Sequence, residues 1–204
     1  MNWNIPNILT LLRLLAAPSV AVMFLYFDRP WADWFALVLF VSAAVTDFVD
    51  GYLARAWKQE TKFGAMMDPI ADKAMVVIAL VVITGFSGMN SWILLPAVLI
   101  IFREIFVSGL REFLGETAGL LKVTNLAKWK TTLQMIAIAL LFAKGAFEDY
   151  LLKHPAEDGF SFLALGANVS WALGIGFLWV AMGLTVLSGA DYFRKALPYL
   201  RDHQ

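Results

Sequence analysis

Six long apolar runs divide this sequence, and they constrain its fold more than any other feature. A membrane-spanning α-helix needs about 20 predominantly apolar residues, and each run approaches or exceeds that length. The runs extend from about Ile8 to Phe27, from Trp31 to about Ala56, from just after Pro69 to near Phe86, from Trp92 to about Leu114, from about Leu126 to Ala143 and from about Asn168 to Leu187. The sequence therefore predicts an all-α polytopic membrane protein with six transmembrane helices.

The composition agrees with this interpretation and excludes other classes of protein. Of the 204 residues, 60% are hydrophobic and 16% are charged, whereas about 25% are charged in a typical soluble domain. Six spans occupy nearly the whole chain, so we expect a single transmembrane domain over residues 1–204. The formal net charge of +0 argues against a nucleic-acid-binding protein. The absence of cysteine excludes disulfides, thiolate metal sites and cysteine nucleophiles.

The distribution of positive charge predicts the orientation in the membrane. Arg29, Lys144 and Lys153 occupy the linkers expected on one side, whereas the other 13 of the 16 lysines and arginines lie on or near the opposite side. By the positive-inside rule the opposite side is cytoplasmic, and with six spans both termini are cytoplasmic. Residues 1–4 carry no basic side chain, so we do not expect a cleaved signal peptide.

Four aspartates stand where the second and third runs meet the cytoplasmic side. Asp47 and Asp50 end the second run, and Asp68 and Asp72 bracket Pro69. At 100° per residue, Asp47 and Asp50 lie about 60° apart on their helix. Asp68 and Asp72 lie about 40° apart on theirs. Two antiparallel helices would therefore aim all four carboxylates into one cleft.

Carboxylates gathered in one cleft repel one another unless cations lie between them. Oxygen-only ligands favour Mg²⁺ or Mn²⁺, and two such ions form the usual clamp for displacement at phosphorus. An ionisable group at membrane depth costs about 2.5–3.5 kcal/mol, so these side chains need partners or a function. The alternative is that they are solvated helix ends, paired with Arg55, Lys58, Lys62 and Lys73.

Small residues accompany the aspartates of the second run. Gly51 lies about 40° from Asp47 on the helix, and Ala54 lies between Asp47 and Asp50. Side chains of this size let a flat ligand approach the backbone, and the adjacent Arg55 suits a phosphate. Close helix packing in the bilayer is the alternative explanation of the glycine and the alanine.

One string of residues joins these features: Asp47-x2-Asp50-Gly51-x2-Ala54-Arg55-x8-Gly64-x3-Asp68-x3-Asp72. Its eight positions resemble the signature of the CDP-alcohol phosphatidyltransferase family, at the family's spacing. Three further segments resemble the bacterial branch of that family whose acceptor is glycerol 3-phosphate. They are Pro6-Asn7-x2-Thr10-x2-Arg13, Arg103-Glu104-Ile105 with Arg111-Glu112, and Lys128-x-Lys130-Thr131-Thr132-x-Gln134.

The resemblance implies a reaction and assigns roles to individual residues. Glycerol 3-phosphate would attack the β-phosphorus of CDP-diacylglycerol through its free primary hydroxyl and release CMP. Asp47, Asp50 and Asp68 would hold two ions of Mg²⁺ or Mn²⁺. Asp72 would be the catalytic general base and also a metal ligand. Cytidine and its phosphate would lie against Gly51, Ala54, Arg55, Thr61, Asn7 and Thr10.

The phosphate of such an acceptor needs cations of its own. Arg103 lies inside the fourth run, and Arg111 lies about 80° round the same helix. Lys128 and Lys130 are about 200° apart, so we expect one of them, Lys130, to face the pocket and keep Lys128 as its alternative. Other partners available to both arginines are anionic lipid headgroups, Glu104 and Glu112.

Other functions stay open at this point. Within the family, the acceptor could instead be phosphatidylglycerol, inositol phosphate or serine. Outside enzymes, intramembrane acids also mark cation or proton-coupled transporters, but those carry acids near the bilayer midplane and a sequence repeat, which this sequence lacks. The resemblance favours a single catalytic domain in a bacterial inner membrane, with its site on the cytoplasmic face. The oligomeric state stays open as well: members of the family resemble dimers, and the small residues of the fifth and sixth runs would permit a homodimer.

Overall fold

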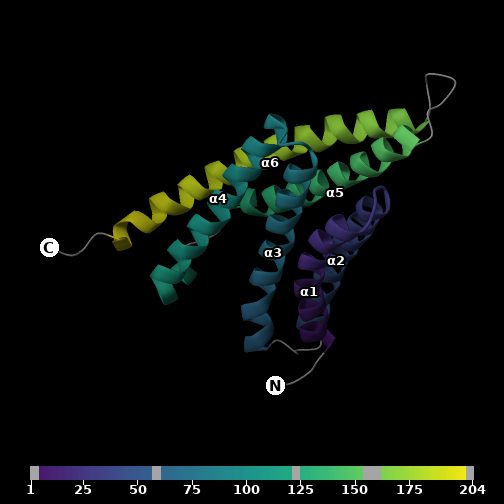
Figure 1. Cartoon of the computed structure of the whole chain (residues 1–204). Coiled ribbons are helices and arrows are strands. Elements are labelled where there is room, and N and C mark those ends of the chain that lie inside the picture. Colours follow the sequence, from purple (N-terminus) through teal and green to yellow (C-terminus); the bar gives the residue numbers. More distant parts are fainter. Residues whose placement is uncertain (1–4, 57–60, 121–124, 154–161, 201–204) are drawn as a thin grey trace.

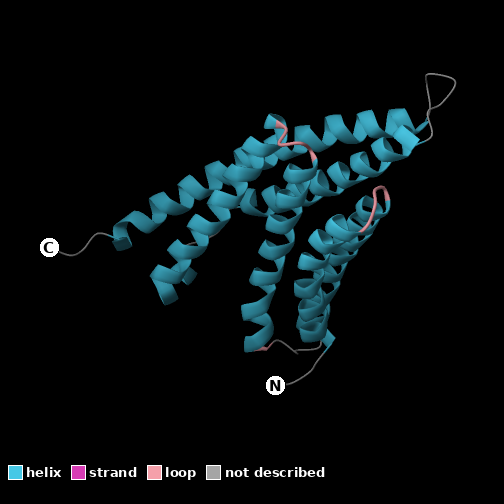
Figure 2. Cartoon of the chain, in the orientation of Figure 1, coloured by secondary structure: helices cyan, strands magenta, loops and turns pink. Residues whose placement is uncertain are grey.

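The computed structural model consists of helices and the turns that join them (Figure 2). It describes residues 5–56, 61–120, 125–153 and 162–200, and within these ranges the side chains of all residues except 5, 6, 47–56, 62, 116, 118, 120 and 125–128. The helices of this part of the chain are α1 (Ile5–Tyr26), α2 (Trp31–Ala56), α3 (Lys62–Phe86), α4 (Ser91–Leu114), the 3-10 helix η1 (Gly115–Leu120), α5 (Asn125–Lys153) and α6 (Phe162–Leu200). The predicted all-α fold is confirmed over these residues.

Four of the described helices are long and apolar enough to cross a membrane. They are α1, α3, α4 and α6, with apolar stretches at Asn7–Tyr26, Phe63–Phe86, Ser91–Leu114 and Phe162–Leu200. The apolar stretch of α2 is shorter and covers Trp31–Thr46. These helices indicate an integral membrane protein, and the full set of six spans stays a prediction.

The start of α3 differs from the prediction. The apolar run was expected to follow Pro69, but the helix begins at Lys62 and carries Pro69 inside it. Thr61 explains the earlier start, because its Oγ1 accepts a hydrogen bond from Gly64 N (3.0 Å) and caps the helix. Pro69 removes one backbone donor, yet the helix continues to Phe86.

Helices α5 and α6 are longer than the apolar runs that predict them. The fifth run ends at Ala143, but α5 continues to Lys153, and α6 extends the sixth run at both ends. Ion pairs four residues apart stabilise such polar extensions, and they join Lys144 to Glu148, Lys153 to Asp149 and Lys195 to Asp191. The two helices pack along each other as a long antiparallel pair (Figure 1).

The packing of α1 positions the polar end of the molecule. Helix α1 packs against both α2 and α3, which also contact α5. Buried apolar side chains of these helices form the main core, among them Val20, Phe40, Leu80, Ile138 and Phe142. The beginning of α1, the end of α2 and the beginning of α3 lie at the same end of the molecule (Figure 1). This arrangement brings the first-run motif to the aspartate string.

Candidate active site

Three side-chain hydrogen bonds join the beginning of α1 to the beginning of α3. They run from Thr61 Oγ1 to Asn7 Oδ1 (2.8 Å), from Thr10 Oγ1 to Asp68 Oδ1 (2.6 Å) and from Arg13 Nη1 to Asp72 Oδ1 (3.0 Å). The partners advance in the same direction along both helices, so α1 and α3 run parallel here. We call these paired residues the α1–α3 ladder.

The α1 side of the ladder is one buried face. Asn7, Thr10 and Arg13 recur every three residues, a step of about 60° round the helix, and none is more than 5% exposed. Polar groups at membrane depth are costly without partners, and side chains from α3 supply those partners. Two motifs that are far apart in the sequence thus contact each other in the structure.

Asp68 and Asp72 lie about one turn apart on α3, and each receives a donor from α1. The Asp72 side chain is nevertheless 51% exposed, whereas the Arg13 side chain is 3% exposed. Arg13 therefore holds Asp72 from the protein side and leaves the carboxylate accessible to a substrate. This arrangement suits a group that must be oriented and must also accept a proton.

The α2 half of the aspartate string is helical, but its side chains lie outside the described residues. This applies to Asp47, Asp50, Gly51, Ala54 and Arg55. Their convergence on the two α3 aspartates therefore stays a prediction. Among the side chains that the structure describes, no group of three or more His, Cys, Asp or Glu is arranged to hold a metal ion.

Gly64 permits the close approach at the first pair of the ladder. A Cβ at this position would lie 2.8 Å from Asn7 Oδ1 and 3.3 Å from Thr61 Oγ1. The backbone N of Gly64 also donates to Thr61 Oγ1 at 3.0 Å. Any side chain at residue 64 would push the Asn7 amide away from its partner, which gives the glycine of the string a structural reason.

A second polar cluster lies on α4 and α5. Glu104 Oε1 accepts a hydrogen bond from Arg103 Nη1 at 3.0 Å and another from Lys130 Nζ. Lys130 is buried, and both Arg103 and Glu104 are largely enclosed. Arg103 Nη2 also donates to Ser188 Oγ on α6 (3.3 Å). We call Arg103, Glu104 and Lys130 the Glu104 cluster.

The close fit of Arg103 against α6 depends on Gly189. A Cβ at residue 189 would lie 2.9 Å from Arg103 Cγ. Arg103 Nε is buried and has no hydrogen-bond partner within the described part of the chain. A buried donor without an acceptor is costly, so the cluster is incomplete without a further acceptor.

The four cations predicted to bind an acceptor phosphate have different surroundings. Arg103 and Lys130 are brought together at Glu104, and the pairing of Arg103 with Glu104, considered above as an alternative, is present as well. Arg111 lies over the ring of Tyr192, with its guanidinium carbon 5.6 Å from the ring centroid. The side chain of the fourth cation, Lys128, lies outside the described residues.

Sequence reasoning assigns no site role to Arg13 or Glu104. A signal for Arg13 exists, since it is the one cation inside the first apolar run and an arginine there needs a partner. Glu104 follows Arg103 directly and enters the sequence argument only as an alternative partner. Its contact with Lys130 joins two helices, and no spacing along one helix predicts it.

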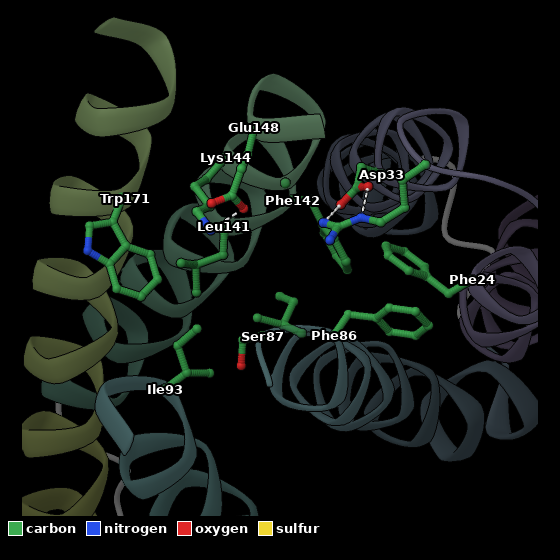
Figure 3. A pocket seen from close by; sticks show the side chains of 13 residues that line it. Phe24, Asp33, Phe86, Ser87, Ile93, Leu141, Phe142, Lys144, Glu148 and Trp171 are labelled. Carbon is green, nitrogen blue, oxygen red and sulfur yellow. Dashed lines mark hydrogen bonds and ion pairs between the residues drawn. The ribbon is translucent and has the colours of Figure 1, made fainter. Parts of the chain in front are cut away.

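A cavity of about 40 Å³ lies at the opposite end of α1, α2 and α3 (Figure 3). Arg29 Nε lies 2.6 Å from Asp33 Oδ2 beside it, and Lys144 pairs with Glu148. Each cation that lines this cavity has a carboxylate of its own. The cavity therefore offers no excess positive charge to a phosphorylated ligand, unlike the Glu104 cluster.

Comparison with known proteins gives one consistent family. A family model described as CDP-alcohol phosphatidyltransferase matches residues 3–187. A Cereibacter sphaeroides protein named CDP-diacylglycerol--glycerol-3-phosphate 3-phosphatidyltransferase is 62% identical over an alignment of 224 positions that covers 100% of both chains. A Pseudomonas fluorescens protein of the same name is 41% identical, covering 97% of this chain and 92% of its own. One from Salmonella choleraesuis is 44% identical, covering 74% of this chain and 83% of its own.

Proposed function

Because this chain belongs to the CDP-alcohol phosphatidyltransferase family, we propose that it transfers a phosphatidyl group from CDP-diacylglycerol to sn-glycerol 3-phosphate. The products are phosphatidylglycerophosphate and CMP, and the reaction is a step of phospholipid biosynthesis. The α1–α3 ladder carries this proposal, because it joins the first-run motif to two aspartates of the string. The names of the full-length relatives support the same donor and acceptor.

Members of the family use divalent metal ions. We assign two ions, Mg²⁺ or Mn²⁺, to Asp47, Asp50, Asp68 and Asp72. This donor set fits them, since it consists of carboxylate oxygens alone. When bound, such ions neutralise the pyrophosphate and stabilise CMP as a leaving group.

Asp72 is the general base of the proposed reaction. A primary hydroxyl is a poor nucleophile at neutral pH, so a nearby carboxylate must take its proton. The hydroxyl oxygen forms a bond to the β-phosphorus while the bond from that phosphorus to the bridging oxygen breaks. The proton passes to Asp72, and the electron pair leaves with CMP. Arg13 is a positioning residue, because it holds Asp72 Oδ1 at 3.0 Å.

We place the nucleotide part of the donor beside the ladder. Asn7, Thr10 and Thr61 present their polar groups at this end of α1 and α3. The remaining contacts that we assign to the nucleotide come from α2 and are Gly51, Ala54 and Arg55. The acyl chains of the donor stay in the bilayer beside the site.

We assign the phosphate of the acceptor to the Glu104 cluster. Arg103 and Lys130 reach one point from two helices and share a single carboxylate. A guanidinium recognises phosphate through two parallel hydrogen bonds. Arg111 and Lys128 are the further cations that we expect to assist. Such a site favours glycerol 3-phosphate over serine, which carries no phosphate.

We also infer six transmembrane helices, with both termini and the active site on the cytoplasmic side of a bacterial inner membrane. The excess of lysine and arginine around the ladder end supports this orientation. A single catalytic domain then covers residues 1–204. Assembly into a homodimer is part of the same proposal and rests on the family resemblance.

Release of CMP by the purified protein in detergent tests the proposed function. The assay contains CDP-diacylglycerol and Mg²⁺ or Mn²⁺, with and without glycerol 3-phosphate. We expect release that requires both the metal and glycerol 3-phosphate and that EDTA abolishes. Release only with serine, inositol phosphate or phosphatidylglycerol would keep the family chemistry and contradict the assigned acceptor. No release with any acceptor, from protein shown to be folded, would contradict the proposed function.

Gly64→Ala is expected to raise the KM for CDP-diacylglycerol about tenfold. A tenfold change corresponds to about 1.4 kcal/mol, which is about the contribution of one hydrogen bond. The new Cβ meets Asn7 Oδ1 at the end of a flexible side chain, so the amide moves while the helices stay packed. Gly85→Ala on the same helix is the matched control, because nothing lies within 4 Å of a Cβ there. If both variants keep the wild-type KM, the role of Asn7 is wrong.

A further inference from the structure

Lys73 connects the α1–α3 ladder to the Glu104 cluster. It follows Asp72 directly on α3, and its Nζ donates to Ser108 Oγ on α4 at 2.6 Å. Ser108 Oγ in turn donates to the backbone oxygen of Glu104, also at 2.6 Å. The positive charge of Lys73 acts on both the Glu104 carboxylate and the Lys130 ammonium. Lys73 therefore bridges the proposed base and the proposed acceptor-phosphate site.

The charge balance around Glu104 favours an additional anion. In the described part of the chain, the Glu104 carboxylate contacts Arg103 and Lys130 directly. The positive charge of Lys73 acts on it as well. Arg103 Nε is buried there without a hydrogen-bond partner, and a lysine ammonium has three donors to satisfy. Excess positive charge at membrane depth is costly. A group with several anionic oxygens, such as a phosphate, would supply acceptors to the ammonium groups of Lys73 and Lys130.

We propose that Lys73 is a third cation for the acceptor phosphate and that it aligns the acceptor with Asp72. This inference rests on the proposed function. Asp72 and Lys73 are neighbours on α3, about 100° apart round the helix, so a phosphate bound to Lys73 stays close to the base. In glycerol 3-phosphate the reacting hydroxyl lies at the other end of a three-carbon chain. Lys73 thus selects acceptors that carry a phosphate a short distance from the reacting hydroxyl.

A purely structural link between α3 and α4 is the competing explanation of the contact between Lys73 and Ser108. Two variants separate the explanations. Lys73→Met removes the charge and keeps a long unbranched side chain, whereas Ser108→Ala removes the link and keeps the charge. If Lys73 binds phosphate, only the first variant is defective. If the contact is only a link between helices, both variants are defective.

The KM for glycerol 3-phosphate, measured by CMP release from the full chain in detergent, gives the first result. We expect Lys73→Met to raise this KM at least about tenfold, with the KM for CDP-diacylglycerol and the Tm unchanged. Ser108→Ala should keep both KM values near those of the wild type, and Lys73→Arg should recover part of the loss. An unchanged KM in Lys73→Met would overturn the proposal. Equal defects in Lys73→Met and Ser108→Ala, with a lowered Tm, would overturn it too.

Binding measured without turnover distinguishes a failure of this inference from a failure of the proposed function. The probes are inorganic phosphate and glycerol 3-phosphate, with glycerol as the uncharged control, and the readout is the ligand-induced rise in Tm. We expect both phosphates to raise the Tm of the wild type and of Ser108→Ala, and to raise that of Lys73→Met less. If the wild type releases no CMP but this difference persists, the reaction is wrong and phosphate binding by Lys73 is supported. If CMP release is normal and all three proteins respond equally, this inference alone is wrong.

Discussion

Asp72→Asn is expected to lower turnover about 10²–10⁴-fold, the contribution typical of a general base. Asparagine has nearly the same shape as aspartate, and its amide oxygen can still accept from Arg13 Nη1, which lies 3.0 Å from Asp72 Oδ1. The amide cannot take a proton from the attacking hydroxyl. This variant therefore removes proton acceptance and keeps the contact with Arg13. Because Asp72 is also assigned to the metal ions, turnover is compared at saturating metal ion.

The effect is measured as CMP release at saturating CDP-diacylglycerol, glycerol 3-phosphate and metal ion. Binding of CMP to the same protein checks that the nucleotide site survives. Glu148→Gln is the matched control, because Glu148 is half-exposed, pairs with Lys144 near the opposite end of the molecule, and exposed pairs contribute little. We expect normal turnover in the control. If Asp72→Asn also turns over within a few-fold of the wild type, Asp72 is not the base.

The sequence predicts the helices well where apolar runs and helices coincide. The bounds of α2, Trp31 and Ala56, are those expected from its run. The apolar run expected after Pro69 is shorter than α3, because the Thr61 cap starts the helix seven residues before that proline. The predicted fifth run ends before α5 does, because ion pairs on the polar extension stabilise the helix as far as Lys153. Hydropathy indicates which residues can enter a bilayer, whereas capping and backbone hydrogen bonds decide where a helix begins and ends.

The ladder shows which part of the site the sequence leaves open. The spacing of Asn7, Thr10 and Arg13 places them on one face of α1, and that of Asp68 and Asp72 places them on one face of α3. Neither spacing predicts that these faces of α1 and α3 contact each other, because that contact depends on how the two helices pack. The resemblance to a family joined the two motifs, and the hydrogen bonds supply the physical reason.

The Glu104 cluster illustrates the same limit on another pair of helices. The angle between Lys128 and Lys130 predicts that only one of them faces a pocket. Lys130 is buried and pairs with Glu104, while the side chain of Lys128 lies outside the described residues. The carboxylate that holds Lys130 comes from α4, so spacing along α5 alone gives no information about it. The one available signal is that Glu104 is the acid next to Arg103 within the fourth apolar run, where an arginine needs a partner.

Gly145→Ala is expected to destabilise the fold by about 3 kcal/mol or more, although residue 145 is far from the ladder. A Cβ at this position on α5 would overlap Asp33 Oδ1 and Arg29 Nη2 and would lie 3.0 Å from Asp33 Cγ. Asp33 is 1% exposed, so its carboxylate cannot move into solvent. The hydrogen bonds that Arg29 donates to Asp33 raise the pKa of the Arg29 guanidinium above its ordinary value, so Arg29 stays charged. Breaking a buried ion pair of this kind typically costs about 3–5 kcal/mol.

Thermal denaturation in detergent measures this loss of stability. Because 1 kcal/mol shifts the Tm of a chain of this size by about 2–4 °C, we expect a fall of about 6 °C or more. Gly176→Ala on α6 is the control, since nothing lies within 4 Å of a Cβ there. If the new methyl acts through Asp33, then Asp33→Ala in the Gly145→Ala background should cost less than the two single losses together. A Gly145→Ala protein as stable as the control would mean that α5 does not support the ion pair.

The same variant tests whether the far end of the molecule supports the active site. The Arg29–Asp33 pair joins the α1–α2 turn to α5 at Gly145. Helix α1 carries half of the ladder, and α5 carries Lys130 of the Glu104 cluster. Loss of packing at this end should therefore change the separation of the two clusters and lower turnover, with no residue of either cluster altered. Normal turnover in a destabilised Gly145→Ala protein would show that the clusters keep their geometry without this support.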